Sequence, residues 1–196
     1  MRGRRFGGRR STTSDSTSDN TEDTPPDRNV ARSAARNTAI GLLARREHAQ
    51  AEIKQKLKVR GYDDELATEV VDELSRQRLL SDERFAEMFI RSRAARGQGP
   101  VRLRGELRQL KLPNELIELR MNAANVDWPL LAREIRQRKF GADIPATMSE
   151  RAKQMRFLQY RGFTADHIRI ALGASYEDDS LGVIDDSDSP DVDPNV

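Results

Sequence analysis

The sequence reads EIKQKLKVRGYD at residues 52–63, RLRGELRQLKLP at residues 102–113 and KQMRFLQYRGFT at residues 153–164. Each segment resembles a basic helix that ends at a turn, with a leucine five residues before a large apolar residue. The leucines are Leu57, Leu107 and Leu158, and the apolar residues are Tyr62, Leu112 and Phe163. Because the segments recur about every 50 residues, they predict three helical units in tandem.

Signals for the starts and ends of helices surround these segments. Four residues can accept hydrogen bonds from the free N–H groups of a first helical turn, namely Asp63, Ser81, Asp127 and Thr164. Thr147 and Glu150 have the spacing of a capping box. Glycines predict helix ends at residues 61, 97, 141 and 162. No stretch alternates apolar and polar residues for long, so we expect no strands.

The composition favours helices that each bury one narrow apolar stripe. Hydrophobic residues make up 36% of the chain, charged residues 34% and aromatic residues 5%. A unit of about 50 residues has little core of its own, so neighbouring units must stack. We therefore predict an all-α, elongated and curved array of three tandem repeats, each with three helices in a helix-turn-helix-like arrangement.

The composition also predicts where the array begins and ends. Residues 1–36 are rich in Arg, Gly, Ser and Thr, and residues 177–196 are acidic, so both are expected to be disordered tails. Between them we place the first repeat at residues 37–80, the second at residues 81–125 and the third at residues 126–176.

The net charge of +2 conceals an uneven distribution. Residues 177–196 hold eight acidic residues and no basic ones, whereas residues 37–176 hold 26 basic and 19 acidic residues, an excess of +7. This excess suggests an anionic partner, either nucleic acid or a protein that carries it, although solubility alone would also explain it. The acidic tail is a candidate to fold back onto the basic body.

The sequence contains no recognisable catalytic or metal-binding constellation. The chain has no cysteine, and His48 and His167 lack the spacing of a metal-binding pair. The run Gly97-Gln98-Gly99-Pro100 is a helix break and not a phosphate-binding loop, because neither Lys-Ser nor Lys-Thr follows it. We therefore expect no enzyme activity and no cofactor. No apolar run approaches the roughly 20 residues that span a bilayer, and the N-terminus lacks the apolar core of a signal peptide, so a cytoplasmic location is expected.

Several short motifs, in this order, resemble the RecX family, which regulates the RecA recombinase of bacteria. They are Leu43-Ala44-Arg45-Arg46-Glu47-His48 with Glu52-Ile53 and Lys56-Leu57, Leu80-Ser81-Asp82-Glu83-Arg84-Phe85-Ala86, Arg91-Ser92-Arg93, Gly97-Gln98-Gly99-Pro100, and Phe157-Leu158-Gln159-Tyr160-Arg161-Gly162-Phe163. The likeness spans roughly residues 37–175. The sequence departs from the family at Lys111, where the other two units have glycine, and mildly at Ser81, where aspartate is common.

The resemblance implies three repeats of three helices and binding within the groove of the RecA–DNA filament. There the protein would limit filament extension, ATP hydrolysis and strand exchange, with RecA and possibly DNA phosphates as partners and no membrane. Our candidates for partner contacts are basic residues of the three units: Arg45, Arg46, Arg84, Arg91, Arg93, Arg102, Arg104, Arg156 and Arg161. Phe85 and Phe163 are expected in the core. The alternatives are a helix-turn-helix protein that binds DNA independently of RecA, and a repeat scaffold for an unrelated protein.

Removal of residues 177–196 should raise the affinity of the chain for polyanions at low salt, because the acidic tail would no longer compete for the basic body. Titration of the full and shortened chains with an oligonucleotide measures this effect. Equal affinities for the two chains would reject the idea that the tail folds back.

Overall fold

The computed structural model describes residues 28–173, which form helices without any strand in that range. The helices are α1 (Arg28–Leu43), α2 (Gln50–Val59), α3 (Asp64–Arg76), α4 (Asp82–Ala95), α5 (Pro100–Gln109), α6 (Asn114–Ala123), α7 (Trp128–Phe140), α8 (Met148–Arg161) and α9 (Ala165–Ala171). Among them, none combines the length and the apolar character that crossing a membrane requires.

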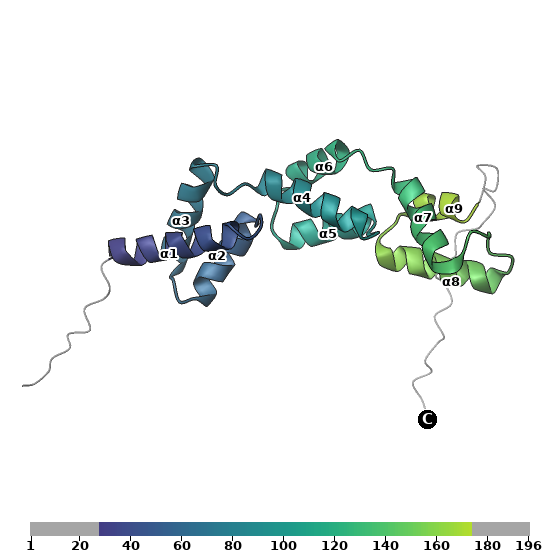
Figure 1. The fold of residues 1–196 in the computed structure, drawn as a ribbon, viewed down its shortest axis with the longest axis horizontal. Helices are drawn as coiled ribbons and strands as arrows, with labels where there is room; N and C mark the ends of the chain where they lie inside the picture. Colours follow the sequence, from purple (N-terminus) through teal and green to yellow (C-terminus); the bar gives the residue numbers. More distant parts are fainter. Residues whose placement is uncertain (1–27, 174–196) are drawn as a thin grey trace, which may run out of the picture.

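The helices pack in three groups that follow one another along the chain. The extensive contacts between helices lie within α1–α3, within α4–α6 and within α7–α9. Figure 1 shows these groups side by side in a gently curved row along the long axis. The predicted all-α array of three stacked three-helix units is therefore confirmed. We call the groups units 1, 2 and 3.

The same turn ends the middle helix of every unit, and we call it the repeated turn. In each unit the apolar residue after the turn donates its backbone N–H to the carbonyl of the leucine five residues earlier. The three N–O distances are 3.3 Å from Tyr62 to Leu57, 3.3 Å from Leu112 to Leu107 and 3.2 Å from Phe163 to Leu158. All three leucines are fully buried. This bond belongs to a Schellman-type helix end, which redirects the chain while burying an apolar pair.

The repeated turn needs one residue in the left-handed region of backbone space. Gly61 and Gly162 occupy it with φ values of 91° and 89°, and Lys111 occupies it in unit 2 with φ of 62°. Glycine adopts this conformation at no steric cost, whereas a residue with a Cβ is strained there. The departure from the family pattern at Lys111 therefore preserves the turn but leaves strain in unit 2.

The predicted helix starts are confirmed. The side chains of Asp63, Ser81, Asp127 and Thr164 each accept a hydrogen bond from a backbone N–H in the first turn of the following helix. Thr147 and Glu150 form the complete capping box at the start of α8. Pro100 opens α5 after the break at residues 97–99, where its missing N–H would have had no helical partner.

Each unit has a small core of its own. Leu74 and Ile53 are buried in the first, Phe85 in the second and Phe163 in the third, which agrees with the core positions expected for the two phenylalanines. Ala49 precedes α2 but is buried in the core of unit 2, and Trp128 packs against the cores of both unit 2 and unit 3. These two residues connect cores that would otherwise be separate.

The expected disorder of residues 1–36 is wrong for residues 28–36, which belong to α1. Arg28, Arg32 and Arg36 lie four residues apart on one face of α1, where they pair with carboxylates of α3. Arg32 lies 2.6 Å from Glu73, Arg36 lies 3.0 Å from the same residue, and Arg28 lies 2.7 Å from Glu69. Ala35 and Ala39 are fully buried against the same unit. Composition alone missed these contacts because the acidic partners are about 40 residues away. The remaining residues of the two expected tails lie outside the described range.

The junction between units 1 and 2 is polar and narrow. The backbone N–H of Gln50 donates to Oδ1 of Asp82 at 2.8 Å, and Glu47 pairs with Arg84 at 2.8 Å. Burial raises the pKa of Asp82, and the hydrogen bond from Gln50 opposes this rise. The start of α4 is thus bound to the residues that precede α2.

The junction between units 2 and 3 depends on close approach of two backbones. The N–H of Gly99 donates to the carbonyl of Arg161 at 2.8 Å, and the N–H of Val101 donates to that of Gly162 at 3.0 Å. A Cβ on Gly162 would lie 2.4 Å from Cβ of Arg102, and one on Gly99 would lie 2.3 Å from the carbonyl oxygen of Gly162. The repeated turn of unit 3 therefore also joins unit 3 to unit 2.

Alanine at Gly162 should destabilise the chain much more than alanine at Gly61. Both substitutions introduce left-handed strain of about 1 kcal/mol. A Cβ at residue 61 meets open space, but a Cβ at residue 162 meets the backbone of Arg102. We expect G162A to cost roughly 2–4 kcal/mol in total, by analogy with overpacked cores. Urea denaturation followed by far-ultraviolet circular dichroism measures both, and equal losses would contradict the described junction.

The carboxyl group of Asp64 should titrate unusually low. Hydrogen bonds from Lys58 and then Lys54 lower its pKa to about 2 from a model-compound value of 3.8. A depressed carboxyl pKa stabilises the folded chain above the unfolded-state value, and this contribution disappears as the pH falls from about 4 through about 2. Carbon-detected NMR titration should give this low midpoint, and Lys58→Met should raise it. An unchanged midpoint in the variant would contradict the assigned pairing.

Candidate partner-binding surface

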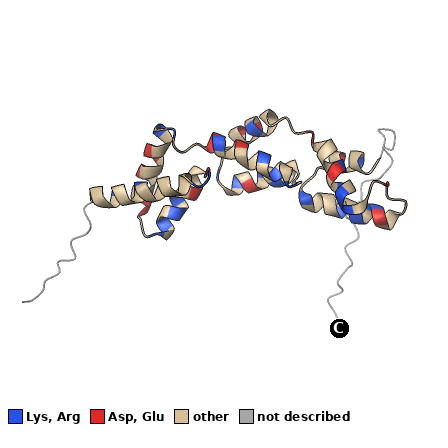
Figure 2. Ribbon diagram, viewed as in Figure 1, with Lys and Arg blue, Asp and Glu red and all other residues tan. Residues whose placement is uncertain are grey.

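The nine candidate arginines are distributed over all three units. Arg45 and Arg46 follow α1, three candidates lie on α4, two on α5 and two on α8. Figure 2 shows basic and acidic segments interspersed along the whole row. Residues 28–173 contain 29 basic and 19 acidic residues. The basic excess is therefore accompanied by many nearby carboxylates, and the pairing of each arginine decides which charges face solvent alone.

Five of the nine candidates pair with carboxylates of the chain itself. The distances are 2.6 Å for Arg46 and Glu52, 2.8 Å for Arg84 and Glu47, 3.6 Å for Arg93 and Glu106, 2.8 Å for Arg102 and Glu106, and 2.9 Å for Arg104 and Glu118. A sixth, Arg161, donates to the carbonyl of Arg96 at 2.9 Å. These guanidinium groups therefore contribute to contacts within the folded chain, in addition to any contact with a partner.

Arg84 forms hydrogen bonds with three other residues of the chain. It pairs with Glu47 across the first junction, and it also donates to the carbonyls of Arg78 and Leu79 at 3.0 and 3.2 Å. The hydrogen bond to Glu47 raises the pKa of Arg84 above its ordinary value. Substitution of Arg84 would therefore disturb the junction between units 1 and 2 as well as any contact with a partner.

Aromatic rings contact three of these six arginines. Arg93 lies over the ring of Phe89, Arg102 over that of Tyr160 and Arg161 over that of Phe157, with distances to the ring centroids of 5.0, 5.9 and 5.2 Å. The contact between Arg102 and Tyr160 crosses the second junction. Tyr160 is 79% exposed, so this stack forms a cationic and aromatic edge between units 2 and 3.

The remaining three candidates, Arg45, Arg91 and Arg156, are exposed and have no ion pair or side-chain hydrogen bond within residues 28–173. We call them the unpaired arginines. Arg45 belongs to unit 1, Arg91 to unit 2 and Arg156 to unit 3. Each unit thus presents one candidate guanidinium group whose five donors remain available to carboxylate or phosphate oxygens.

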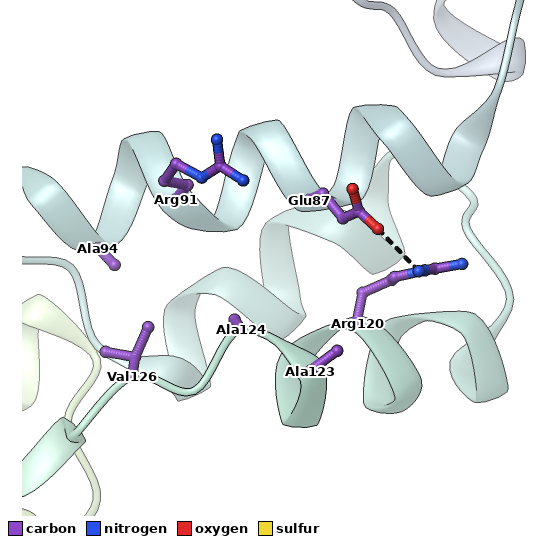
Figure 3. A pocket seen from close by; sticks show the side chains of 7 residues that line it. All are labelled: Glu87, Arg91, Ala94, Arg120, Ala123, Ala124 and Val126. Atoms are coloured by element: carbon purple, nitrogen blue, oxygen red, sulfur yellow. Dashed lines mark hydrogen bonds and ion pairs between the residues drawn. The ribbon is translucent and has the colours of Figure 1, made fainter.

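Arg91 lies at the edge of a pocket between α4 and α6. Figure 3 shows Arg91 and Glu87 on α4 and Arg120 on α6, with three alanines and Val126 forming the rest of the lining. The pocket has a volume of about 240 Å³. Because the alanine side chains are short, a group that approaches Arg91 can come close to both helices.

Arg120 lies on the opposite wall of this pocket and was not among the candidate residues. Arg120 pairs with Glu87 at 2.7 Å and with Glu83 at 3.0 Å, while its buried Nε has no hydrogen-bond partner among the described residues. The only sequence signal was the spacing of Glu83 and Glu87, which places two carboxylates on one face of α4. It could not identify a partner more than 30 residues later.

Arg136 is a second arginine whose role only the structure shows. It is 2% exposed and donates to the carbonyls of Asp143 and Ala142 at 2.7 and 3.0 Å. It therefore holds the loop between α7 and α8 and is not available to a partner. A buried charge with several carbonyl acceptors is stable where an isolated one would not be.

Both histidines contact residues of the chain itself. His48 is buried, with Nδ1 2.9 Å from Oε2 of Glu52 but without hydrogen-bond geometry. His167 accepts a hydrogen bond from the N–H of Thr164 at the start of α9, and burial lowers its pKa. Within residues 28–173 no group of three His, Asp or Glu side chains has an arrangement suited to a metal ion.

Comparison with protein families gives three matches in the order of the three units. The models of the first, second and third three-helix domains of RecX match residues 35–74, 81–119 and 131–172. Two relatives named regulatory protein RecX come from Halorhodospira halophila and Pseudomonas fluorescens. The first is 48% identical over 146 residues, or 74% of this chain and 91% of the relative, and the second is 43% identical over 142 residues, or 72% and 92%.

A solved structure shares the arrangement of the helices. The crystal structure of RecX from Lactobacillus salivarius has a TM-score of 0.63 and 17% sequence identity, and the match covers 74% of this chain and 96% of the other. At this identity the match supports the fold alone. Since the three domain models together cover more than half of the sequence and the relatives are matched over nearly their full length, the chain belongs to the RecX family of regulatory proteins.

Proposed function

We propose that this chain is a non-enzymatic modulator, mainly an inhibitor, of the RecA recombinase. It would lie in the groove of the RecA–DNA filament and limit filament extension, ATP hydrolysis and strand exchange. Membership of a family of regulatory proteins supports a regulatory role. The observation that carries the proposal is the position of the unpaired arginines Arg45, Arg91 and Arg156, one on each unit of an elongated body.

A row of weak cationic contacts suits a partner that is itself a polymer. One exposed ion pair contributes only about 0–1 kcal/mol. Contacts carried on one chain reinforce one another, because after the first has formed the others become intramolecular. Units that touch successive subunits would thus be retained on a filament but not on a single subunit. Such bridging would resist the relative movements of subunits that extension and ATP hydrolysis require.

The pocket between α4 and α6 supports a contact with protein acids in addition to DNA phosphates. The guanidinium group of Arg91 has no carboxylate partner within the described chain, whereas Arg120 on the other wall of the pocket is paired with Glu83 and Glu87. An aspartate or glutamate side chain of the partner would supply acceptors for the guanidinium group of Arg91. This contact would occur in unit 2, which packs against unit 1 at one end and unit 3 at the other.

The direct test is a titration of RecA. The full chain should inhibit DNA-dependent ATP hydrolysis by RecA at amounts well below one per RecA monomer, since one bridging molecule affects several subunits. Its binding to bare DNA is measured in the same salt. Tight binding to bare DNA without inhibition at low ratio would instead favour the alternative of a DNA-binding protein that acts independently of RecA.

Charge reversal of the unpaired arginines should weaken this inhibition without unfolding the chain. At about 0.5 kcal/mol for each exposed contact, the variant R45E/R91E/R156E corresponds to a roughly tenfold rise in the concentration for half-inhibition. The helical content should remain unchanged, because none of the three side chains holds an ion pair in the described range.

A matched variant separates specific contacts from net charge. R76E/R133E/K139E makes the same change of charge at three exposed residues that are not among our candidates. We expect it to inhibit almost as well as the unchanged chain. Equal loss in both variants would show that only the overall charge matters, and no loss in the first variant would exclude the unpaired arginines as contacts.

A further inference from the structure

A second surface, distinct from the unpaired arginines, lies between the last two helices. A groove of about 200 Å³ separates α8 from α9, and its lining is mainly apolar. Met155 of α8 lines one wall of the groove, and Ile168 of α9 lines the other together with Leu172, the residue that follows α9. Met155 is 37% exposed, whereas Ile168 and Leu172 are almost fully buried. The groove therefore offers an apolar floor that solvent reaches through its open side.

The charged residues that line this groove are basic. Arg151 lies at its edge on α8 and has no ion pair within residues 28–173, while Arg169 lies on α9 and pairs with Asp166 at 3.8 Å. The groove therefore combines an apolar lining with two guanidinium groups. A complementary ligand is a short apolar segment with acidic residues at both ends.

The sequence of this chain contains such a segment shortly after α9. Residues 181–184 read LGVI, with Asp178-Asp179 before them and Asp185-Asp186 after them. The described chain leaves unit 3 at Gly173, the residue after Leu172 of the groove wall. Seven residues separate Gly173 from Leu181. Eight steps along an extended chain reach up to about 27 Å, which exceeds the width of a small helical unit.

We propose that residues 178–186 bind the groove between α8 and α9 of the same chain. Leu181, Val183 and Ile184 would occupy the apolar floor beside Met155, and the flanking aspartates would approach Arg151 and Arg169. The short tether favours this occupant over others, because it holds the segment at an effective concentration in the millimolar range. Even a weak apolar contact is then populated.

The bound segment would also alter the charge of unit 3. It brings four aspartates next to α8, the helix that carries the unpaired Arg156. This consequence alone rests on the proposed function, since it makes the segment a competitor of an anionic partner at unit 3. Occupation of the groove itself requires no partner and can be tested on the isolated chain.

Methyl NMR of the full chain tests the proposal through the two methionines of α8. Met155 lies in the groove, whereas Met148, which is 74% exposed at the start of α8, lines no part of it. Replacing Val183 and Ile184 by aspartate (V183D/I184D) should shift the methyl resonance of Met155 to its position in a chain that lacks residues 177–196. The resonance of Met148 should change little.

A matched control keeps the chemistry and changes the position. V192D/V196D introduces the same type of substitution outside the proposed segment, and it should leave the Met155 resonance where the unchanged chain has it. An identical Met155 resonance in the unchanged chain, in V183D/I184D and in the shortened chain would overturn the proposal, as would equal shifts from the two double variants.

A spin label decides between the same chain and a second copy. The sequence has no cysteine, so S180C gives a single attachment site. The label should broaden the Met155 resonance of its own chain, and V183D/I184D should abolish this effect. Broadening of Met155 in an isotope-labelled chain mixed with separate spin-labelled chains would assign the groove to a second copy and overturn the intramolecular proposal. No RecA is present, so either failure leaves the proposed function untouched.

Discussion

The backbone hydrogen bond from the residue after the repeated turn to the leucine five positions earlier is the constraint from which each unit is built. It ends the middle helix, buries Leu57, Leu107 or Leu158, and directs the last helix of the unit back across the core. In unit 3 the same turn presents the carbonyls of Arg161 and Gly162 to unit 2. In unit 3 the repeated turn therefore ends the middle helix and also forms the junction with unit 2. Strain introduced at this turn affects the core of unit 3 and the junction.

The junctions between units are narrow compared with the packing inside them. Unit 1 is bound to unit 2 mainly through the polar contacts of Asp82 and Arg84. The buried Ala49 adds an apolar contact with the core of unit 2. Unit 2 is bound to unit 3 through backbone contacts of glycines and through Trp128. Small interfaces of this kind permit relative movement of the parts they connect.

Ion pairing determines which of the many charges are left for a partner. The arginines of α1 are used to hold α1 on α3, Arg84 is used at the first junction and Arg136 is buried in unit 3. The unpaired arginines form a much smaller set than the basic composition suggests. Among the nine candidate arginines, one without an ion pair lies on each unit, and this spacing gives the proposed binding reach along a polymer.

Much of the fold follows from the sequence, because caps, glycine stops and the spacing from leucine to apolar residue are local signals. They identified the helix starts at Asp63, Ser81, Asp127 and Thr164, the helix break before Pro100 and the repetition of the units. Even Lys111 could be recognised as the residue that replaces glycine. The pairing of charges could not be predicted in the same way. The partners of Arg28, Arg104 and Arg120 are between 14 and 41 residues away, and only the packing of helices decides which carboxylate each side chain meets. Signals between neighbouring residues thus determined the helices and their repeat. Contacts between distant residues decided that residues 28–36 form part of a helix, and which of the candidate arginines have no ion pair, because these depend on how the helices pack.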